Sequence, residues 1–296
     1  MSHHIKTPLF FLIPAFLLLA LFVFYPMVDT IYMSFVDQDG NFVGLGNYEK
    51  VFGTRIYPLV NTKNVALGKF PMGALVHNIF WIAIHLPLCV FFGLLLAVLL
   101  RDVKGGSIMK SVIFLGMVIP LIVGGVLVRF ILDRDAGILN GILRVIGLGA
   151  YATDWTFYPN TALITVILGS VWLWTGFAMI VYSAGLEGIP VELYEAAKID
   201  GASRWKTFWR ITVPMLRSST ITVVTMTLLW ELKIFDVIYI VTNAGPGGAS
   251  DVMAFRMYIE AFQYPPNYGT ATAIATVLTI MTFGFAAYMV NRMTKS

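Results

Sequence analysis

Six long apolar stretches, each followed by a more polar segment, dominate the pattern of the chain. They lie near residues 8–28, 78–100, 111–132, 161–185, 219–242 and 269–291. Each is close to the roughly 20 apolar residues that a helix needs to cross the hydrocarbon core of a bilayer. The pattern predicts an all-α polytopic membrane protein with six transmembrane helices in one domain, residues 1–296. An even number of spans puts both termini on the same side of the membrane.

The first apolar stretch is predicted to stay in the protein as a span. Lys6 precedes the run PLFFLIPAFL, as a basic residue would in a signal peptide. No small-residue cleavage pattern follows, because the chain continues as PMVDTIYMSF. We therefore count this stretch as the first transmembrane helix.

The distribution of basic residues predicts which side faces the cytoplasm. With a cytoplasmic N-terminus, the inner segments carry 11 Lys and Arg residues and the longer outer segments carry 7. Cytoplasmic segments of membrane proteins are enriched in these residues. Both termini are therefore expected in the cytoplasm, together with the loop 186–218 between the fourth and fifth spans.

Composition supports a membrane protein and excludes several other classes. Apolar residues make up 58% of the chain, charged residues 12%, and the mean hydropathy is +0.80. This charged share is about half of that in a soluble domain. The net charge of +4 is what basic cytoplasmic loops produce, so no nucleic-acid partner is expected. The single cysteine, Cys89, excludes a disulfide within the chain and is expected to be a packing residue.

No motif for catalysis, nucleotide binding or metal binding occurs in the sequence. The phosphate-binding loop G-x-x-x-x-G-K-[ST] is missing, so this chain is not expected to bind ATP. His77 and His85 have no acidic third ligand at metal-site spacing and are expected in the core. No nucleophile–base pair is visible. The chain is therefore expected not to be an enzyme and to bind no cofactor of its own.

The loop 186–218 combines dense charge with large aromatic residues. A short helix is predicted from Val191 to Asp200, and Gly201 is a natural left-handed end for it. Ser203 can cap a second helix that runs from Arg204 to Val213. Pro214 is expected to end or kink this second helix before the fifth span.

The two helices predicted in this loop have different faces. The first has a face of small and apolar side chains from Leu193, Ala196 and Ala197. The second repeats apolar residues at i, i+3, i+4 and i+7, namely Trp205, Phe208, Trp209 and Thr212. Such an element can lie on the membrane surface with its Trp side chains at the interface. It can equally dock against a cytoplasmic partner, and the residues alone leave both alternatives open.

The spacing in this loop resembles the EAA signature of the membrane subunits of ABC importers, E-A-A-x3-G-x9-I-x-L-P. Here the matching residues are Glu195, Ala196, Ala197, Gly201, Ile211, Val213 and Pro214. The one departure is Val213 in place of leucine, which is conservative. The segments FVFYPMVDTIYMSF, GLGNYEKVF and LKIFDVIYIVTNAGP look like those of sugar-importer permeases, in particular the larger membrane subunit of the maltose transporter. The extra N-terminal spans and the large periplasmic insertion of that subunit are absent.

The resemblance implies a type I ABC importer in the cytoplasmic membrane of a prokaryote. A second homologous permease would complete the translocation pathway. Two ATPase subunits would bind ATP and Mg and would power transport. An extracytoplasmic solute-binding protein would deliver a mono- or oligosaccharide. The permeases, surrounded by membrane lipid, would move this substrate across by alternating access. The residues implied in ATPase docking are Glu195, Ala196, Ala197 and Gly201, with Arg204 and Lys206 as candidate salt-bridge partners. The aromatic face is then expected to pack on the chain's own helices or on the membrane surface.

Alignment with the maltose-type subunit implies a sugar-lining position for two groups of residues. The fourth span contributes Ser170, Leu173, Trp174 and Phe177. The fifth span contributes Thr227, Trp230 and Glu231. The third span offers Met117 and Leu121, which cannot donate hydrogen bonds to a sugar. For every aromatic residue in these groups, helix packing remains the alternative.

Three charged residues fall within the predicted fifth span, where each must face protein or water. On a continuous helix, Lys233 and Asp236 lie about 60° apart and are expected to form a structural pair. Glu231 lies well away from both and is expected to face a cavity.

Two other functions remain open from the sequence. One is an ABC permease for a non-sugar solute such as a polyol, glycerol phosphate or a peptide. The other is a proton-coupled secondary carrier that uses Glu231 and Asp236. No internal repeat relates the two halves of the chain, which weakens the carrier hypothesis.

Overall fold

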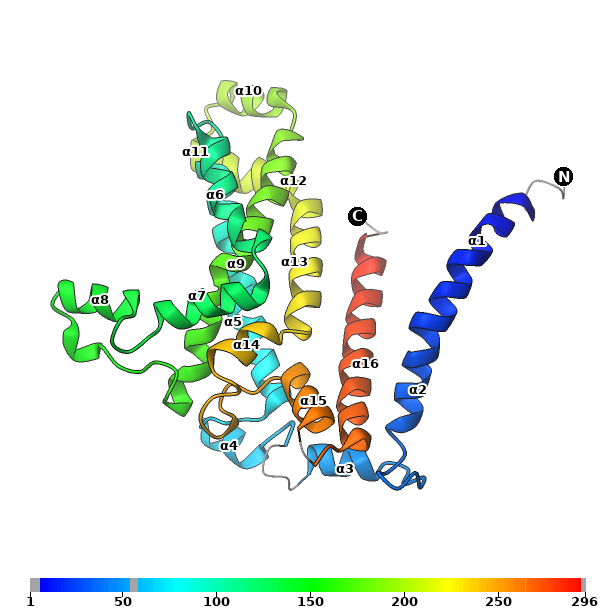
Figure 1. Ribbon diagram of the computed structural model, residues 1–296. Coiled ribbons are helices and arrows are strands. Elements are labelled where there is room, and N and C mark those ends of the chain that lie inside the picture. Colours follow the sequence, from blue (N-terminus) through cyan, green and yellow to red (C-terminus); the bar gives the residue numbers. More distant parts are fainter. Residues whose placement is uncertain (1–5, 54–57, 264, 294–296) are drawn as a thin grey trace.

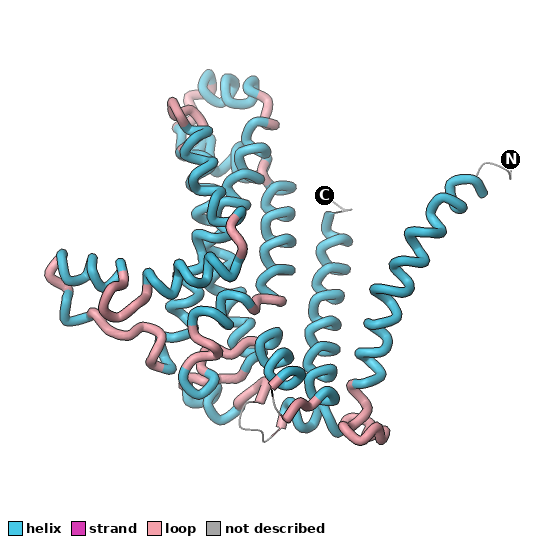
Figure 2. The backbone as a smooth tube through the Cα atoms, in the orientation of Figure 1, coloured by secondary structure: helices cyan, strands magenta, loops and turns pink. Residues whose placement is uncertain are grey.

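The computed structural model describes residues 6–53, 58–263 and 265–293. In this part of the chain all long elements are helices (Figures 1 and 2). Three predicted spans are single helices: α5 (Ala74–Leu99), α9 (Pro159–Glu187) and α16 (Tyr268–Met293). These helices confirm the second, fourth and sixth spans to within a few residues.

The first span is also confirmed, and it runs further than predicted. It consists of α1 (Lys6–Leu19), the π-helical turn η1 (Ala20–Phe24) and α2 (Tyr25–Met33). At the end of η1 the N–H of Tyr25 bonds to the carbonyl of Ala20, five residues back. Because Pro26 has no N–H and its ring crowds the preceding turn, this wider turn lets the helix continue through the proline. The span therefore ends at Met33 and not near residue 28.

The predicted third span, 111–132, is wrong as a continuous helix. The structure has α6 (Gly106–Val118) and α7 (Leu121–Ile131), bent by 102°. Pro120 causes the break, because it removes a helical hydrogen bond and forces Ile119 into an extended conformation, with φ −69° and ψ 143°.

The predicted fifth span, 219–242, is likewise wrong in its second half. Helix α13 (Arg217–Leu232) ends early, and α14 (Asp236–Val241) starts after a short non-helical link (Figure 2). Phe235 in the link stacks with Tyr239 at 5.4 Å and meets the ring of Tyr258 edge-on at 5.2 Å. The link contains no proline. The break instead coincides with the tertiary packing of the Phe235 ring.

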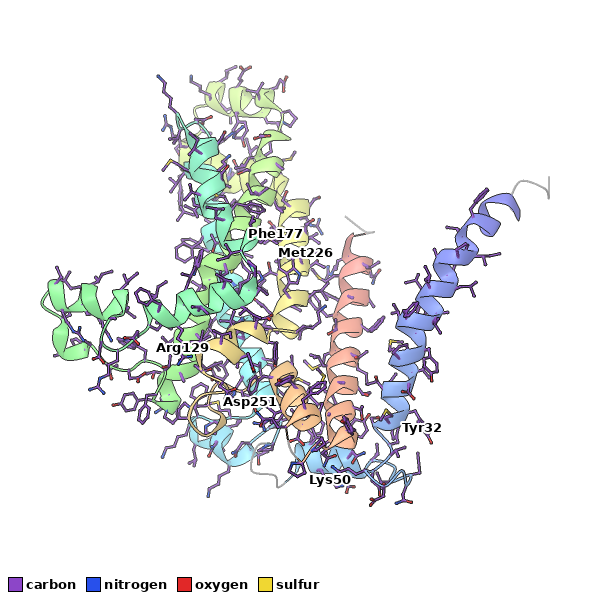
Figure 3. The ribbon with its side chains drawn as sticks, viewed as in Figure 1. Tyr32, Lys50, Arg129, Phe177, Met226 and Asp251 are labelled. Atoms are coloured by element: carbon purple, nitrogen blue, oxygen red, sulfur yellow. The ribbon has the colours of Figure 1, made fainter. Side chains whose placement is uncertain are left out.

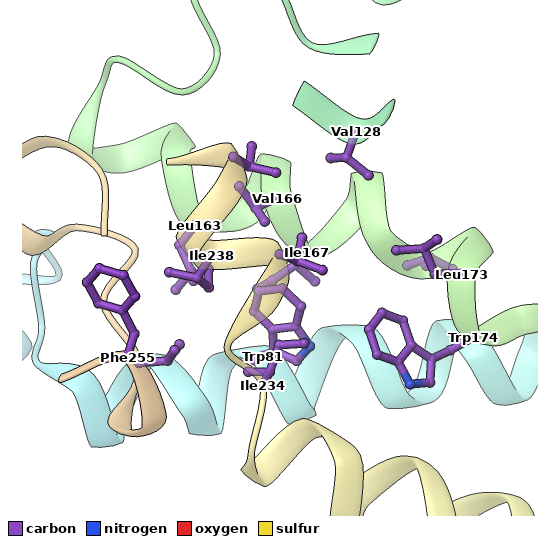
Figure 4. Close-up of a cluster of buried hydrophobic side chains, with 14 of the residues drawn as sticks. Trp81, Val128, Leu163, Val166, Ile167, Leu173, Trp174, Ile234, Ile238 and Phe255 are labelled. Atoms are coloured by element: carbon purple, nitrogen blue, oxygen red, sulfur yellow. The ribbon is translucent and has the colours of Figure 1, made fainter. Parts of the chain in front are cut away.

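The core lies where α5, α9 and α14 meet (Figure 4). Trp81 on α5 and a row of apolar side chains on α9, including Leu163 and Ile167, are almost fully buried there. Further along, a Cβ at Gly93 would lie 2.4 Å from the Cβ of Ala178, so α5 and α9 approach closely. Cys89 is fully buried between them, which confirms it as a packing residue.

One end of the bundle carries several of the shorter helices. They are α3 (Gly46–Phe52), α4 (Thr62–Leu67), the 3-10 turn η4 (Pro246–Gly248) and α15 (Met253–Phe262). Asp251 ties this end together: its carboxylate accepts a hydrogen bond from Nε of Arg256 at 2.6 Å, and its carbonyl lies 2.8 Å from Nδ1 of His77 (Figure 3). Helix α8 (Ile138–Val145) and the 3-10 turn η2 (Gly149–Tyr151) project sideways from the bundle (Figure 1).

The opposite end holds α10 (Val191–Ile199) together with the start of α1 and the end of α16 (Figure 1). This agrees with six membrane crossings. The assignment of this end to the cytoplasm stays a prediction from the basic residues.

Candidate functional site

A cavity of about 230 Å³ lies between the two broken helices and α9. It is lined by Met117, Leu121, Leu173, Trp174, Trp230, Lys233, Ile234, Phe235 and Asp236. Met117 and Leu121 flank the α6–α7 break, and Lys233 to Asp236 form the α13–α14 break. The two deviations from the predicted helices therefore both shape this cavity.

The cavity is lined by aromatic rings and by charged side chains that do not pair with each other. Trp174 packs edge-on against His85, with ring centroids 5.2 Å apart, and Trp230 packs edge-on against Phe177 at 5.1 Å. Within the described residues, no ion pair joins Lys233 to Asp236. The predicted structural pair is therefore wrong, because the helix that would have aligned the two side chains ends at Leu232.

The residues expected to contact a sugar divide into two groups. Leu173, Trp174 and Trp230 line the cavity, together with Met117 and Leu121. The remaining four are not among its lining residues, and their contact with a substrate stays a prediction: Ser170, Phe177, Thr227 and Glu231.

Three of these four are held by packing. Ser170 is fully buried and donates to the carbonyl of Ile167 at 2.9 Å. Thr227 is also fully buried, and its hydroxyl has no hydrogen-bond partner in the described part of the chain. Phe177 is half-buried on the side of α9 that faces α13 (Figure 3).

Glu231 faces α5 and not the cavity. Its Oε1 lies 2.6 Å from Nδ1 of His85, and both side chains are almost completely buried. The Glu231 carbonyl accepts a hydrogen bond from Asn78 at 3.2 Å, and the Asn78 side chain in turn accepts from the N–H of Met253. Glu231 therefore stands at a junction of α5, α13 and α15. The prediction of His77 and His85 as core residues is confirmed.

Sequence reasoning missed Lys233, Phe235 and Asp236 as cavity residues. A signal was present, because two charges three residues apart in an apolar stretch are costly in a membrane. On a continuous helix the Lys233 and Asp236 side chains would point toward each other. In the structure Lys233 lies in the link and Asp236 begins α14, and both residues line the cavity.

The loop 186–218 folds largely as predicted. Gly201 adopts φ 71° after α10, and the Ser203 side chain accepts a hydrogen bond from the N–H of Lys206 at 3.3 Å. The second helix consists of α11 (Arg204–Thr207), the π-helical turn η3 (Phe208–Thr212) and α12 (Val213–Met215).

Pro214 does not end this second helix. As in the first span, a π-helical turn comes directly before the proline: the N–H of Val213 bonds to the carbonyl of Phe208. The helix continues to Met215 and bends by 63° into α13 at Leu216. The expected kink is therefore present two residues later than the proline.

One side of α10 is turned outward. Glu195 and Ala196 are exposed, and Ile199 is 86% exposed although it is apolar. Ala197 is buried, and Tyr194 packs inward with its hydroxyl 3.2 Å from Oγ1 of Thr212. Helix α10, which carries these exposed residues, lies at the end of the bundle (Figure 1).

The aromatic face of the second helix packs on the chain only in part. Phe208 is half-buried, whereas Trp205 is 71% exposed and Trp209 is 52% exposed. The three rings contact one another, with centroid distances between 5.2 and 6.3 Å. The expected packing on the chain's own helices therefore holds for Phe208 alone.

Comparisons with known proteins agree with these features. Residues 89–295 match the family model described as binding-protein-dependent transport system inner membrane component. A protein of Pyrococcus horikoshii named "probable ABC transporter permease protein" is 50% identical over 289 residues, which are 97% of this chain and 98% of that protein. The alpha-glucoside transport system permease protein of Rhizobium meliloti is 34% identical over 297 residues, which are 97% and 82% of the two chains.

A solved structure shares the fold. It is a bacterial ABC transporter involved in the import of the acidic polysaccharide alginate, and one of its chains matches with a TM-score of 0.79. That chain is 21% identical, and the match covers 96% of this chain and 94% of that one. The predicted importer-permease fold is thereby confirmed. The chain belongs to the family of inner-membrane components of binding-protein-dependent ABC transport systems.

Proposed function

We propose that the chain forms, with a second homologous permease, the pathway of an ATP-driven importer for a mono- or oligosaccharide. The cavity between the broken helices and α9 carries this proposal. Two indole rings, from Trp174 and Trp230, can pack against the faces of a sugar ring. The indole N–H groups, Lys233 and Asp236 are left without hydrogen-bond partners in the described part of the chain, and these groups match sugar hydroxyls.

The names of the relatives support a carbohydrate. One relative is named for alpha-glucoside transport, and the structural neighbour is involved in alginate import. The cavity of this chain holds one cation and one anion, so it does not select strongly for a charged solute. A neutral sugar fits this balance best, and a polyol is the second choice because it presents the same hydroxyl groups.

The exposed side of α10 supports docking of an ATPase. Glu195, Ala196 and Gly201 lie at the tip of the bundle, and apolar Ile199 beside them is almost fully exposed. ATP and Mg would be bound by two ATPase subunits and not by this chain. Closure of the ATPases around ATP would move α10, and the bundle would turn the cavity outward to a solute-binding protein. Hydrolysis of ATP would turn the opening of the cavity back toward the cytoplasm.

The first span supports a second permease beside this one. None of the residues in its apolar window is buried by the rest of the chain. It contacts α16 through α2 and otherwise stands apart from the bundle (Figure 1). A homologous permease could pack in the space between this span and the bundle.

Replacement of Trp230 by alanine should raise the KM for sugar uptake roughly tenfold, because one aromatic wall of about 1.4 kcal/mol is lost. Trp172→Ala is the matched control. Trp172 lies on α9 like Trp174 but lines a separate, almost wholly apolar cavity with Leu88 and Phe92. Its replacement should leave KM within about twofold of the wild type. Equal KM values in the Trp230→Ala variant and the wild type would refute a substrate role for the cavity.

A further inference from the structure

A second cavity, of about 440 Å³, lies at the root of the 186–218 loop. It is an open cavity bordered by the ends of α5 and α9 and by the two helices of the loop. Its lining residues are Val98, Arg101, Leu186, Tyr194, Lys198, Ala202, Arg204, Thr207, Phe208 and Thr212. The proposed sugar pathway does not use this cavity.

The cavity gathers three cations and no anion. Arg101, Lys198 and Arg204 come from three different segments, and no acidic side chain lines the space with them. Within the described residues none of the three forms an ion pair. The guanidinium of Arg101 lies 5.2 Å from the centre of the Tyr194 ring, which holds this cation at the wall. Three unpaired cations around one cavity favour a ligand with a concentrated negative charge.

The other lining residues indicate that this ligand also has an apolar part. Val98, Leu186 and Phe208 add apolar lining to the cavity, and Tyr194, Thr207 and Thr212 add residues that carry hydroxyls. Beside the cavity, Trp205 and Trp209 are exposed, as aromatic residues are at the boundary between membrane and water. A free phosphate ion would leave the apolar lining uncovered, whereas a phospholipid would cover it with the start of its acyl chains.

We propose that this cavity binds the phosphate head group of an anionic phospholipid from the cytoplasmic leaflet. Arg101, Lys198 and Arg204 surround the phosphate, and the lipid joins the end of α5 to both helices of the loop. Arg204, on α11, then binds the lipid phosphate and is not a salt-bridge partner of the ATPase. The lipid holds α10 in the orientation in which Glu195 and Ala196 point away from the membrane.

The test is lipid binding by the full-length chain in a neutral detergent, measured by native mass spectrometry. The probes are phosphatidylglycerol, phosphatidylcholine and inorganic phosphate. The test variant carries Arg101→Gln, Lys198→Gln and Arg204→Gln. The control variant carries Lys104→Gln, Arg210→Gln and Arg217→Gln, which remove one Lys and two Arg outside the cavity.

The wild type should retain phosphatidylglycerol in preference to phosphatidylcholine. The test variant should bind phosphatidylglycerol on the order of 100-fold more weakly, because each charge-assisted hydrogen bond to the phosphate contributes several-fold or more. The control variant should stay within about threefold, because its charges act only through solvent. Lys198→Gln alone, at an exposed position of α10, should weaken binding by about fivefold and guards against misfolding of the triple variant.

Three results would overturn the proposal. Equal losses in the test and control variants would show only general surface attraction. Equal retention of the two lipids by the wild type would remove the role of the negative charge. Full displacement of phosphatidylglycerol by millimolar inorganic phosphate would identify a site for the free anion instead of a lipid.

Discussion

Gly201→Asp is expected to prevent the ATPase from co-purifying with this chain and to lower ATP-driven uptake on the order of 100-fold. Gly201 adopts φ 71°, and a Cβ at this position would meet no other atom of the chain within 4 Å. The cost inside the chain is therefore limited to backbone strain of about 1–2 kcal/mol. The larger effect is expected on binding of the ATPase, because a docked partner would have to bury the new carboxylate. Glu195→Lys, which reverses an exposed charge on α10, should act in the same direction.

Gly147→Asp is the matched control for this experiment. Gly147 has φ 82° and equally open surroundings, but it lies between α8 and η2, away from the 186–218 loop. This variant should reach the membrane and bind the ATPase normally. If the ATPase associates normally with both Gly201→Asp and Glu195→Lys, α10 is not its docking site.

Glu231→Ala should lower the free energy of unfolding by about 1–3 kcal/mol, because it removes the buried hydrogen bond to His85 and leaves Nδ1 of the imidazole without that partner. The measurement is thermal unfolding of the purified chain in detergent. Glu231→Gln keeps the shape of the side chain and can still hydrogen-bond to His85. Its free energy of unfolding should therefore fall by less than half as much as that of Glu231→Ala. Unchanged unfolding temperatures in both variants would contradict the structural role.

Uptake separates this structural role from direct contact with substrate. If Glu231 only joins α5 to α13, the Glu231→Gln variant should transport with a KM close to that of the wild type. A KM raised tenfold or more with an unchanged unfolding temperature would restore Glu231 to the substrate path, as expected from the sequence.

The helices that could be predicted from the sequence are those set by local pattern. Runs of more than 20 apolar residues locate α5, α9 and α16 because a membrane span needs that length. The break at Pro120 was visible as a proline, but its sharpness was not, since many membrane helices bend only slightly at proline. The break after Leu232 has no local signal, because it depends on rings from α14 and α15 that pack against Phe235.

The same distinction applies to the candidate sites. The spacing of Glu195, Gly201 and Pro214 is local, so the docking loop could be identified from it. The pairing of His85 with Glu231 joins residues 146 positions apart, and nothing in either segment indicates the other. Lys233 and Asp236 stand out as charges in an apolar stretch, but their expected direction depends on a helix that ends at Leu232, before either residue.

ATP-driven import of a sugar by this chain can be measured with the assembled transporter. The most direct test is sugar uptake by proteoliposomes that contain this permease with its partner permease, ATPase and binding protein. We expect uptake that requires ATP on the side of the 186–218 loop and persists when a protonophore is added. Uptake that proceeds without ATP and collapses with the protonophore would contradict it.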